Sequence, residues 1–240
     1  MAAELEFRQV DVFTDVPFTG NGLIVLFGST AEVGARALIS LTAEMRQFEL
    51  IVADFQPEVG RVSARIFTAE EELPFAGHPV IGAAAALHER FTAGEPARSW
   101  VFVIAGREIT VRSRRTAVYY EAEMDQGSPT LDPPLGQQDA AWFARALKFV
   151  YLFEPDKREG RSWDNTGAVE DVATGSAAGP AAAFLAAHGL AAQDETILIN
   201  QGRLLGRPSV IAVTPDRLGH LWVGGPVAPV ARGVPDRLPG

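Results

Sequence analysis

A single glutamate within an apolar stretch is the first candidate for chemistry. Glu49 lies among Phe48, Leu50, Ile51 and Val52. Apolar surroundings disfavour the ionised form of a carboxyl group and therefore raise its pKa. A carboxyl group with a pKa near neutrality is suited to general acid–base catalysis. The local sequence also allows the commoner alternative, in which this glutamate simply points into solvent beside a strand.

Two glycine turns open two alanine-rich segments. Gly77 is followed by His78, and Gly175 is followed by Ser176. The first turn of a helix carries unpaired backbone N–H groups and a partial positive charge, and glycine lets a ligand approach the backbone closely. Such helix starts bind carboxylate or phosphate groups. As a matched pair, the turns predict an anion-binding site. Taken singly, His78 also fits a satisfied turn residue and Ser176 a helix cap.

The two turns belong to an internal repeat. At a constant offset of 98 residues, Glu72 matches Glu170 and Gly77 matches Gly175, and an alanine-rich segment follows in each copy. Two copies of one supersecondary unit predict two related domains in tandem. The alternative is that alanine-rich helices resemble each other by composition alone.

Short β-prone segments surround these helices. A helix that is apolar on every side must be buried on every side, so we expect each alanine-rich helix inside a curled sheet. The spacing of Leu38, Leu41 and Met45 predicts a further helix, with Thr30 as its cap. Another short helix is expected from about Asp139, after a linker at 126–138. Strands are expected at 23–27, 50–53, 62–66, 100–105, 109–111, 150–153, 196–200, 209–213 and 221–223.

Composition excludes several classes of function. The net charge of −9 argues against binding to nucleic acid. The absence of cysteine excludes disulfides, thiolate metal sites and cysteine nucleophiles, and the four scattered histidines show no metal-ligand spacing. No apolar run approaches the ~18 residues of a membrane span, and the N-terminus does not read as a secretory signal. A cytoplasmic location, without nucleic-acid or membrane partners, is expected.

Specific motifs spread over nearly the whole chain carry a resemblance. They are DVF (11–13), FTGN (18–21), EMRQFE (44–49), RIFT (65–68), ELPFAGHP (72–79), MDQ (124–126), VEDVATGSAAGP (169–180), QG (201–202) and GRPS (206–209). In this order they resemble the phenazine-biosynthesis PhzF-like family of the diaminopimelate-epimerase superfamily.

The resemblance implies an α+β fold of two similar domains, each a barrel-like bent sheet around a central helix, with the active site between them. We expect one domain at 1–125, with Glu49 and the Gly77 turn. The other is expected at 126–240, with Asp171 and the Gly175 turn. The last strand is expected to pair back with the first domain, and the protein to form a homodimer.

The resemblance also implies roles for single residues. Glu49 corresponds to the family's general acid/base, while His78 and Asp171 correspond to positions that assist proton transfer. The substrate-binding positions correspond to Gly77, Gly175 and Ser176. No cofactor or metal is expected.

The implied activity is an isomerase that moves a proton on a small carboxylated substrate. In the family's best-understood members this substrate is dihydro-hydroxyanthranilate, a cyclic amino acid of phenazine biosynthesis. Relative to typical members, the chain is shortened after 140–149 and irregular at 161–167. These departures favour the alternative of a non-catalytic protein of the same fold, which binds small carboxylates or serves as a scaffold.

Overall fold

Eight strands close into a barrel around one helix. The computed structural model describes residues 5–29, 31, 33–131, 149–164 and 167–235. Neighbouring barrel strands are hydrogen-bonded, and pairing of the last strand with the first closes the ring. In sheet order they are β1 (Glu6–Val12), β2 (Asn21–Phe27), β3 (Glu49–Gln56), β4 (Arg61–Phe67), β6 (Ala97–Ile104), β7 (Arg107–Arg115), β8 (Tyr120–Asp125) and β14 (Leu221–Gly233).

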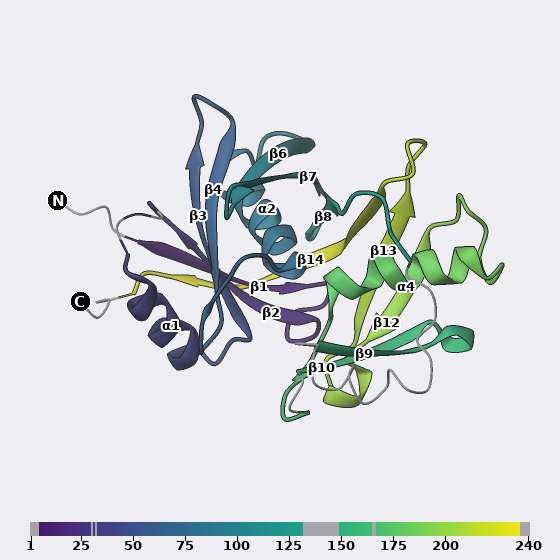
Figure 1. Ribbon diagram of the computed structural model, residues 1–240. Helices are drawn as coiled ribbons and strands as arrows, with labels where there is room; N and C mark the ends of the chain where they lie inside the picture. Colours follow the sequence, from purple (N-terminus) through teal and green to yellow (C-terminus); the bar gives the residue numbers. More distant parts are fainter. Residues whose placement is uncertain (1–4, 30, 32, 132–148, 165–166, 236–240) are drawn as a thin grey trace.

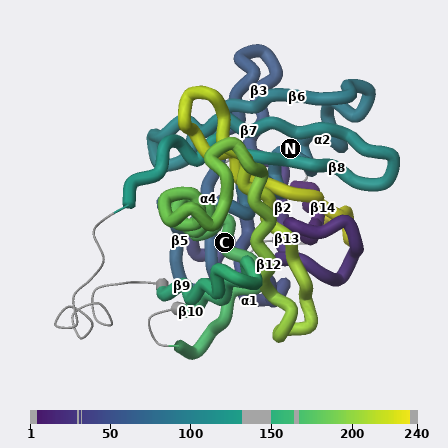
Figure 2. The backbone as a smooth tube through the Cα atoms, turned by 90° about the vertical axis from the view of Figure 1, so that its right-hand side faces the viewer, coloured from purple at the N-terminus to yellow at the C-terminus, as the bar shows by residue number. Residues whose placement is uncertain are grey.

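Helix α2 (Gly77–Phe91) fills the barrel, as its uniformly apolar sequence predicts. It is buried without a break from Gly77 to His88. Figure 1 shows it surrounded by the barrel strands, with the second sheet and α4 in green to one side. The turned view in Figure 2 shows β6, β7 and β8 as neighbouring runs of chain along one side of the barrel. The fit is tight at Gly82, where an added Cβ would lie 2.5 Å from Leu23 Cδ2 and 2.9 Å from Val12 Cγ2.

Replacement of this glycine is expected to destabilise the barrel. Gly82→Ala forces a methyl group into close-packed atoms of β1 and β2, so we expect unfolding free energy to fall by about 1–3 kcal/mol. Urea unfolding measures it. At Gly94 an added Cβ meets nothing within 4 Å, so Gly94→Ala should be neutral or slightly stabilising. Equal stabilities of the two variants would contradict this account of the packing.

A second sheet continues from β14 and carries helix α4 (Gly175–Ala187). The expectation that this helix is buried on every side is wrong for the described residues, because Pro180 and Phe184 are exposed. The buried residues recur at intervals of three and four along one face, which packs on β13 and β14. The second-sheet strands are β13 (Ser209–Pro215), β12 (Ile197–Gln201), β10 (Glu159–Asp164) and β11 (Glu170–Asp171), with β9 (Phe149–Glu154) on β10.

The internal repeat has a counterpart in local structure. A two-residue strand, β5 (Glu72–Leu73), pairs with β4 just before α2, and β11 pairs with β10 just before α4. The matched glutamates each bind an arginine of the neighbouring strand, at 2.9 Å from Arg65 Nε to Glu72 Oε1 and 2.7 Å from Arg161 Nε to Glu170 Oε1. The irregular segment at 161–167 therefore begins within a regular strand, β10, which pairs with β11 as β4 pairs with β5 in the first copy.

Several sequence predictions have definite outcomes. The strands predicted at the positions of β2, β3, β4, β6, β7, β9, β12 and β13 are confirmed, although β1, β5, β8, β10 and β11 were not predicted. Helix α1 (Ala35–Glu44) buries Leu38 as expected. Its N-cap position is Gly34, and the predicted cap, Thr30, lies outside the described residues. The helix expected near Asp139 also lies outside them. Two short 3-10 helices span Pro155–Lys157 and Arg203–Leu205.

The long last strand, β14, connects the two sheets. Its first part lies between β13 and β8, and its residues from 227 to 233 pair with β1. The boundary between two domains at 125 stays a prediction. Among the described residues, no helix has both the length and the apolar character that crossing a membrane requires.

Candidate active site

A pocket of about 400 Å³ lies where the two alanine-rich helices begin. It is lined by the first residue of β3, the starts of α2 and α4, and residues of β9, β10 and β11. All six residues singled out from the sequence line it: Glu49, Gly77, His78, Asp171, Gly175 and Ser176. The structure therefore brings together the predicted acid/base group and both predicted anion-binding turns.

Glu49 is buried in this pocket rather than directed into solvent. Glu49 is 5% exposed. It is the first residue of β3 and lies opposite Leu23 of β2. Burial, and then the charge of Asp171, raises the pKa of the Glu49 carboxyl well above its usual range. Its Oε2 atom lies 3.3 Å from His78 Nδ1, but no hydrogen bond joins the two groups. The carboxyl group therefore keeps an oxygen available to a ligand.

His78, the second residue of α2, is equally buried. Burial lowers the pKa of its imidazole to about 3, against the opposing effect of a backbone hydrogen bond with Gly22. The ring is therefore neutral near pH 7. Its Nε2 atom has no hydrogen-bond partner among the described residues. A neutral imidazole with one unpartnered nitrogen can donate to or accept from a ligand, depending on its tautomer.

Asp171, the last residue of β11, is held by two side chains. Thr174 Oγ1 donates to its Oδ2 at 2.6 Å, and Asn21 Nδ2 donates to its Oδ1 at 2.9 Å. Burial raises the pKa of Asp171 to about 6, although these hydrogen bonds and the nearby backbone N–H groups act in the opposite direction. Asp171 is therefore mainly ionised at neutral pH, beside a glutamate that resists ionisation.

Two residues that the sequence analysis did not single out, Asn21 and Gln201, hold Asp171 and its neighbours in place by hydrogen bonds. Asn21 also donates to the Ala173 carbonyl at 2.9 Å and lies 3.4 Å from His78 Nδ1, so it connects the two halves. Gln201 donates to Thr174 Oγ1 at 3.0 Å and to the Asp171 carbonyl at 2.9 Å. Both are 1% exposed. Asn21 ends the FTGN motif at the start of β2, and Gln201 begins the QG motif at the end of β12. Membership of these motifs was the only indication in the sequence that the two residues belong to the site.

The two helix starts face each other closely. A Cβ added at Gly77 would lie 3.4 Å from Ser176 N, and one added at Gly175 would lie 3.9 Å from His78 N. Neither helix has a side-chain cap hydrogen bond. Ser176 is therefore not a cap, because α4 begins one residue before it, after Thr174. Two uncapped helix starts at one pocket present N–H groups of the kind that bind anions, so the anion-binding site stays a prediction.

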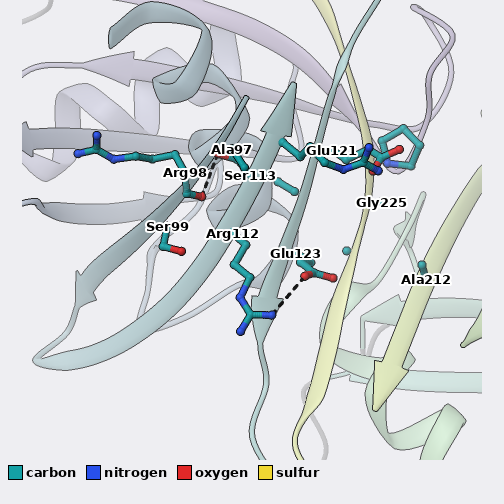
Figure 3. A pocket seen from close by; sticks show the side chains of 13 residues that line it. Ala97, Arg98, Ser99, Arg112, Ser113, Glu121, Glu123, Ala212 and Gly225 are labelled. Carbon is teal, nitrogen blue, oxygen red and sulfur yellow. Dashed lines mark hydrogen bonds and ion pairs between the residues drawn. The ribbon is translucent and has the colours of Figure 1, made fainter. Parts of the chain in front are cut away.

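A larger hollow of about 600 Å³ lies elsewhere, on β6, β7, β8, β13 and β14 (Figure 3). Four of its charged side chains form two ion pairs. Arg112 lies 3.8 Å from Glu123, and Arg114 pairs with Glu121. It contains none of the buried groups with strongly shifted pKa values that characterise catalytic sites. We therefore place the candidate active site in the smaller pocket.

The hydrogen bond from Asn21 to Asp171 is expected to hold the aspartate pKa down. Asn21→Ala removes a donor that favours the ionised carboxylate, so the pKa of Asp171 should rise further, by about 0.5–1 unit. Carbon-13 NMR titration of the aspartate carboxyl groups measures the change. Asn200→Ala, at an exposed position on β12, serves as the control. An unchanged Asp171 titration in Asn21→Ala would contradict the assigned hydrogen bond.

Comparisons with known proteins agree over most of the chain. The trans-2,3-dihydro-3-hydroxyanthranilate isomerase of Pseudomonas chlororaphis is 29% identical over 272 residues, covering 93% of this chain and 96% of that protein. The solved structure of a predicted epimerase from Pseudomonas aeruginosa is 37% identical, with a TM-score of 0.88, covering 97% of this chain and 99% of that one.

More distant structures share the fold. A probable proline racemase from Agrobacterium radiobacter has a TM-score of 0.59 at 12% identity, covering 95% of this chain and 92% of that one. The predicted fold of the diaminopimelate-epimerase type is thus confirmed. The family described as phenazine biosynthesis-like protein matches residues 10–152 and 159–226. This chain therefore belongs to the phenazine biosynthesis-like protein family.

Proposed function

We propose that the protein is an isomerase that moves a proton between carbon atoms of a small carboxylated substrate, without a cofactor. The isomerase class is supported by relatives of that name that match most of the chain. We propose trans-2,3-dihydro-3-hydroxyanthranilate, or a cyclic amino acid like it, as the substrate. The observation that carries the proposal is a buried Glu49 carboxyl, with an unpartnered oxygen, in the pocket where both helix starts meet.

In the proposed reaction, Glu49 removes a proton from one carbon and returns it to another. A raised pKa makes the ionised form of this carboxyl group a stronger base toward the substrate carbon. Neutral His78 and ionised Asp171 lie beside it and assist the transfer. The substrate carboxylate lies against the N–H groups at Gly77, Gly175 and Ser176, which fixes the reacting carbon near the glutamate.

Proton NMR in deuterium oxide tests the proposal. The purified protein is incubated with trans-2,3-dihydro-3-hydroxyanthranilate, and we expect its conversion to a double-bond isomer that can carry solvent deuterium at the newly protonated carbon. Calorimetry on the same sample reports binding. Binding without conversion or exchange would contradict the isomerase proposal and favour a non-catalytic carboxylate-binding protein.

The expected homodimer stays a prediction, which light scattering checks.

A further inference from the structure

One polar atom at the pocket has no part in the proposed reaction. Among the described residues, four buried side-chain atoms lack a hydrogen-bond partner: Glu49 Oε2, His78 Nε2, Gln126 Oε1 and the Tyr151 hydroxyl oxygen. The pocket is lined by the glutamate, the histidine and the tyrosine. Because an unpaired buried polar group costs free energy, the three groups at the pocket are expected to find partners in a ligand or in water.

Strand pairing places Tyr151 on the same wall as Asp171. Tyr151 of β9 lies directly opposite Ser162 of β10, which lies directly opposite Asp171 of β11. Directly opposite residues in adjacent antiparallel strands project from the same face of a sheet. All three residues line the pocket. Tyr151, Ser162 and Asp171 therefore form a line of polar side chains across three strands, and Asp171 is the member predicted to assist proton transfer.

A glycine on β10 leaves room for this hydroxyl group. A Cβ at Gly160 would overlap the Tyr151 hydroxyl oxygen and its ring carbon. The backbone of Gly160 does not need glycine for its conformation, because its φ lies outside the positive range. The Tyr151 ring also stacks on Phe153, with centroids 6.3 Å apart. The side chain thus has a defined place.

The surroundings indicate which ligand group this tyrosine meets. Burial and the charge of Asp171 both raise the pKa of Tyr151, so its hydroxyl stays protonated and can donate. A substrate carboxylate near Asp171 would meet like-charge repulsion, whereas the helix starts offer it N–H donors. A neutral oxygen acceptor on the ligand is the partner that suits this protonated hydroxyl as a donor.

On the basis of the proposed function, we propose that the Tyr151 hydroxyl donates a hydrogen bond to the ring hydroxyl of the substrate. The tyrosine thereby selects hydroxylated over unhydroxylated cyclic amino acids. Gly160 acts as its positioning residue, because a larger residue would displace the phenol.

Two stable aromatic compounds that differ only in this hydroxyl group test the proposal. Calorimetry compares 3-hydroxyanthranilate with anthranilate. We expect wild-type protein to bind the hydroxylated compound about tenfold more tightly. In Tyr151→Phe the ratio of the two affinities should fall to about one, with anthranilate affinity unchanged. Because the variant loses only an unpartnered hydroxyl, it should keep its thermal stability.

Controls separate this role from a general effect on the fold. Tyr119→Phe, outside the pocket, should keep the wild-type ratio, and Gly160→Ala should lower it as Tyr151→Phe does. An unchanged ratio in Tyr151→Phe, or a wild-type ratio of one, overturns the assignment and leaves the proposed function standing. Failure of the wild-type protein to bind either compound overturns both.

Discussion

Glu49→Gln is expected to lower kcat for the proposed isomerisation by about 10²–10⁴-fold. Glutamine keeps the shape of the side chain but cannot remove and return a proton. We expect KM to change little, because the substrate carboxylate is held at the helix starts. Burial makes the ionised carboxyl costly in the folded protein. The neutral amide removes that cost, so the variant should be at least as stable as the wild type at pH 8.

The matched control is Glu44→Gln, the same substitution at an exposed position at the end of α1. It should keep full activity. Steady-state kinetics with the dihydro compound, together with thermal unfolding of each variant, provides both readouts. Wild-type turnover by a folded Glu49→Gln protein would remove this residue from the chemistry.

Asp171→Asn is expected to lower activity and raise stability in the same protein. We expect kcat to fall by about 10²–10³-fold, because the variant lacks the negative charge beside Glu49 and His78. Stability should change in the opposite direction, because burial makes the ionised aspartate unfavourable in the folded state. Such opposition is typical of active sites, where function keeps groups that folding alone would reject.

The sign of the pH dependence follows from the direction of the pKa shift. The pKa of Asp171 rises from its ordinary 3.8 to about 6 on folding. Its stabilising contribution is therefore complete below pH 3.8 and is lost as the pH rises through 6. The asparagine variant has no such loss. Its advantage in unfolding free energy over the wild type should grow by about 1–3 kcal/mol between pH 4 and pH 8.

Urea unfolding at several pH values measures this difference. Asp194→Asn, at an exposed position, is the control and should track the wild type throughout. A stability difference between Asp171→Asn and wild type that stays constant from pH 4 to pH 8 would mean that this carboxyl is not buried as described.

The sequence near each residue predicted those features of the site that depend only on neighbouring residues. The apolar neighbours of Glu49 indicated burial, and the glycines before two alanine-rich segments indicated two helix starts. Their meeting at one pocket followed from the repeat and the family resemblance. The hydrogen-bonding residues around Asp171 were not predicted, because Asn21 lies 150 positions away and no spacing rule connects the two.

Composition predicted the burial of a helix less well where small residues dominate its sequence. Alanine packs against a sheet or faces solvent with little difference in free energy, so α4 carried no sign of its exposed face. The predicted strand at 221–223 was also too short. Gly224, Gly225 and Pro226 indicate a break in a strand, yet β14 continues through them as it passes from the second sheet to the barrel.

The path of β14 bears on how the chain folds during synthesis. The strand that closes the barrel between β1 and β8 is β14, which follows every other described strand in the sequence. Until the ribosome has added those residues, β1 and β8 both keep an open edge, and such edges are prone to aggregation. Barrel closure must therefore await synthesis of β14, although the other seven barrel strands are made before it.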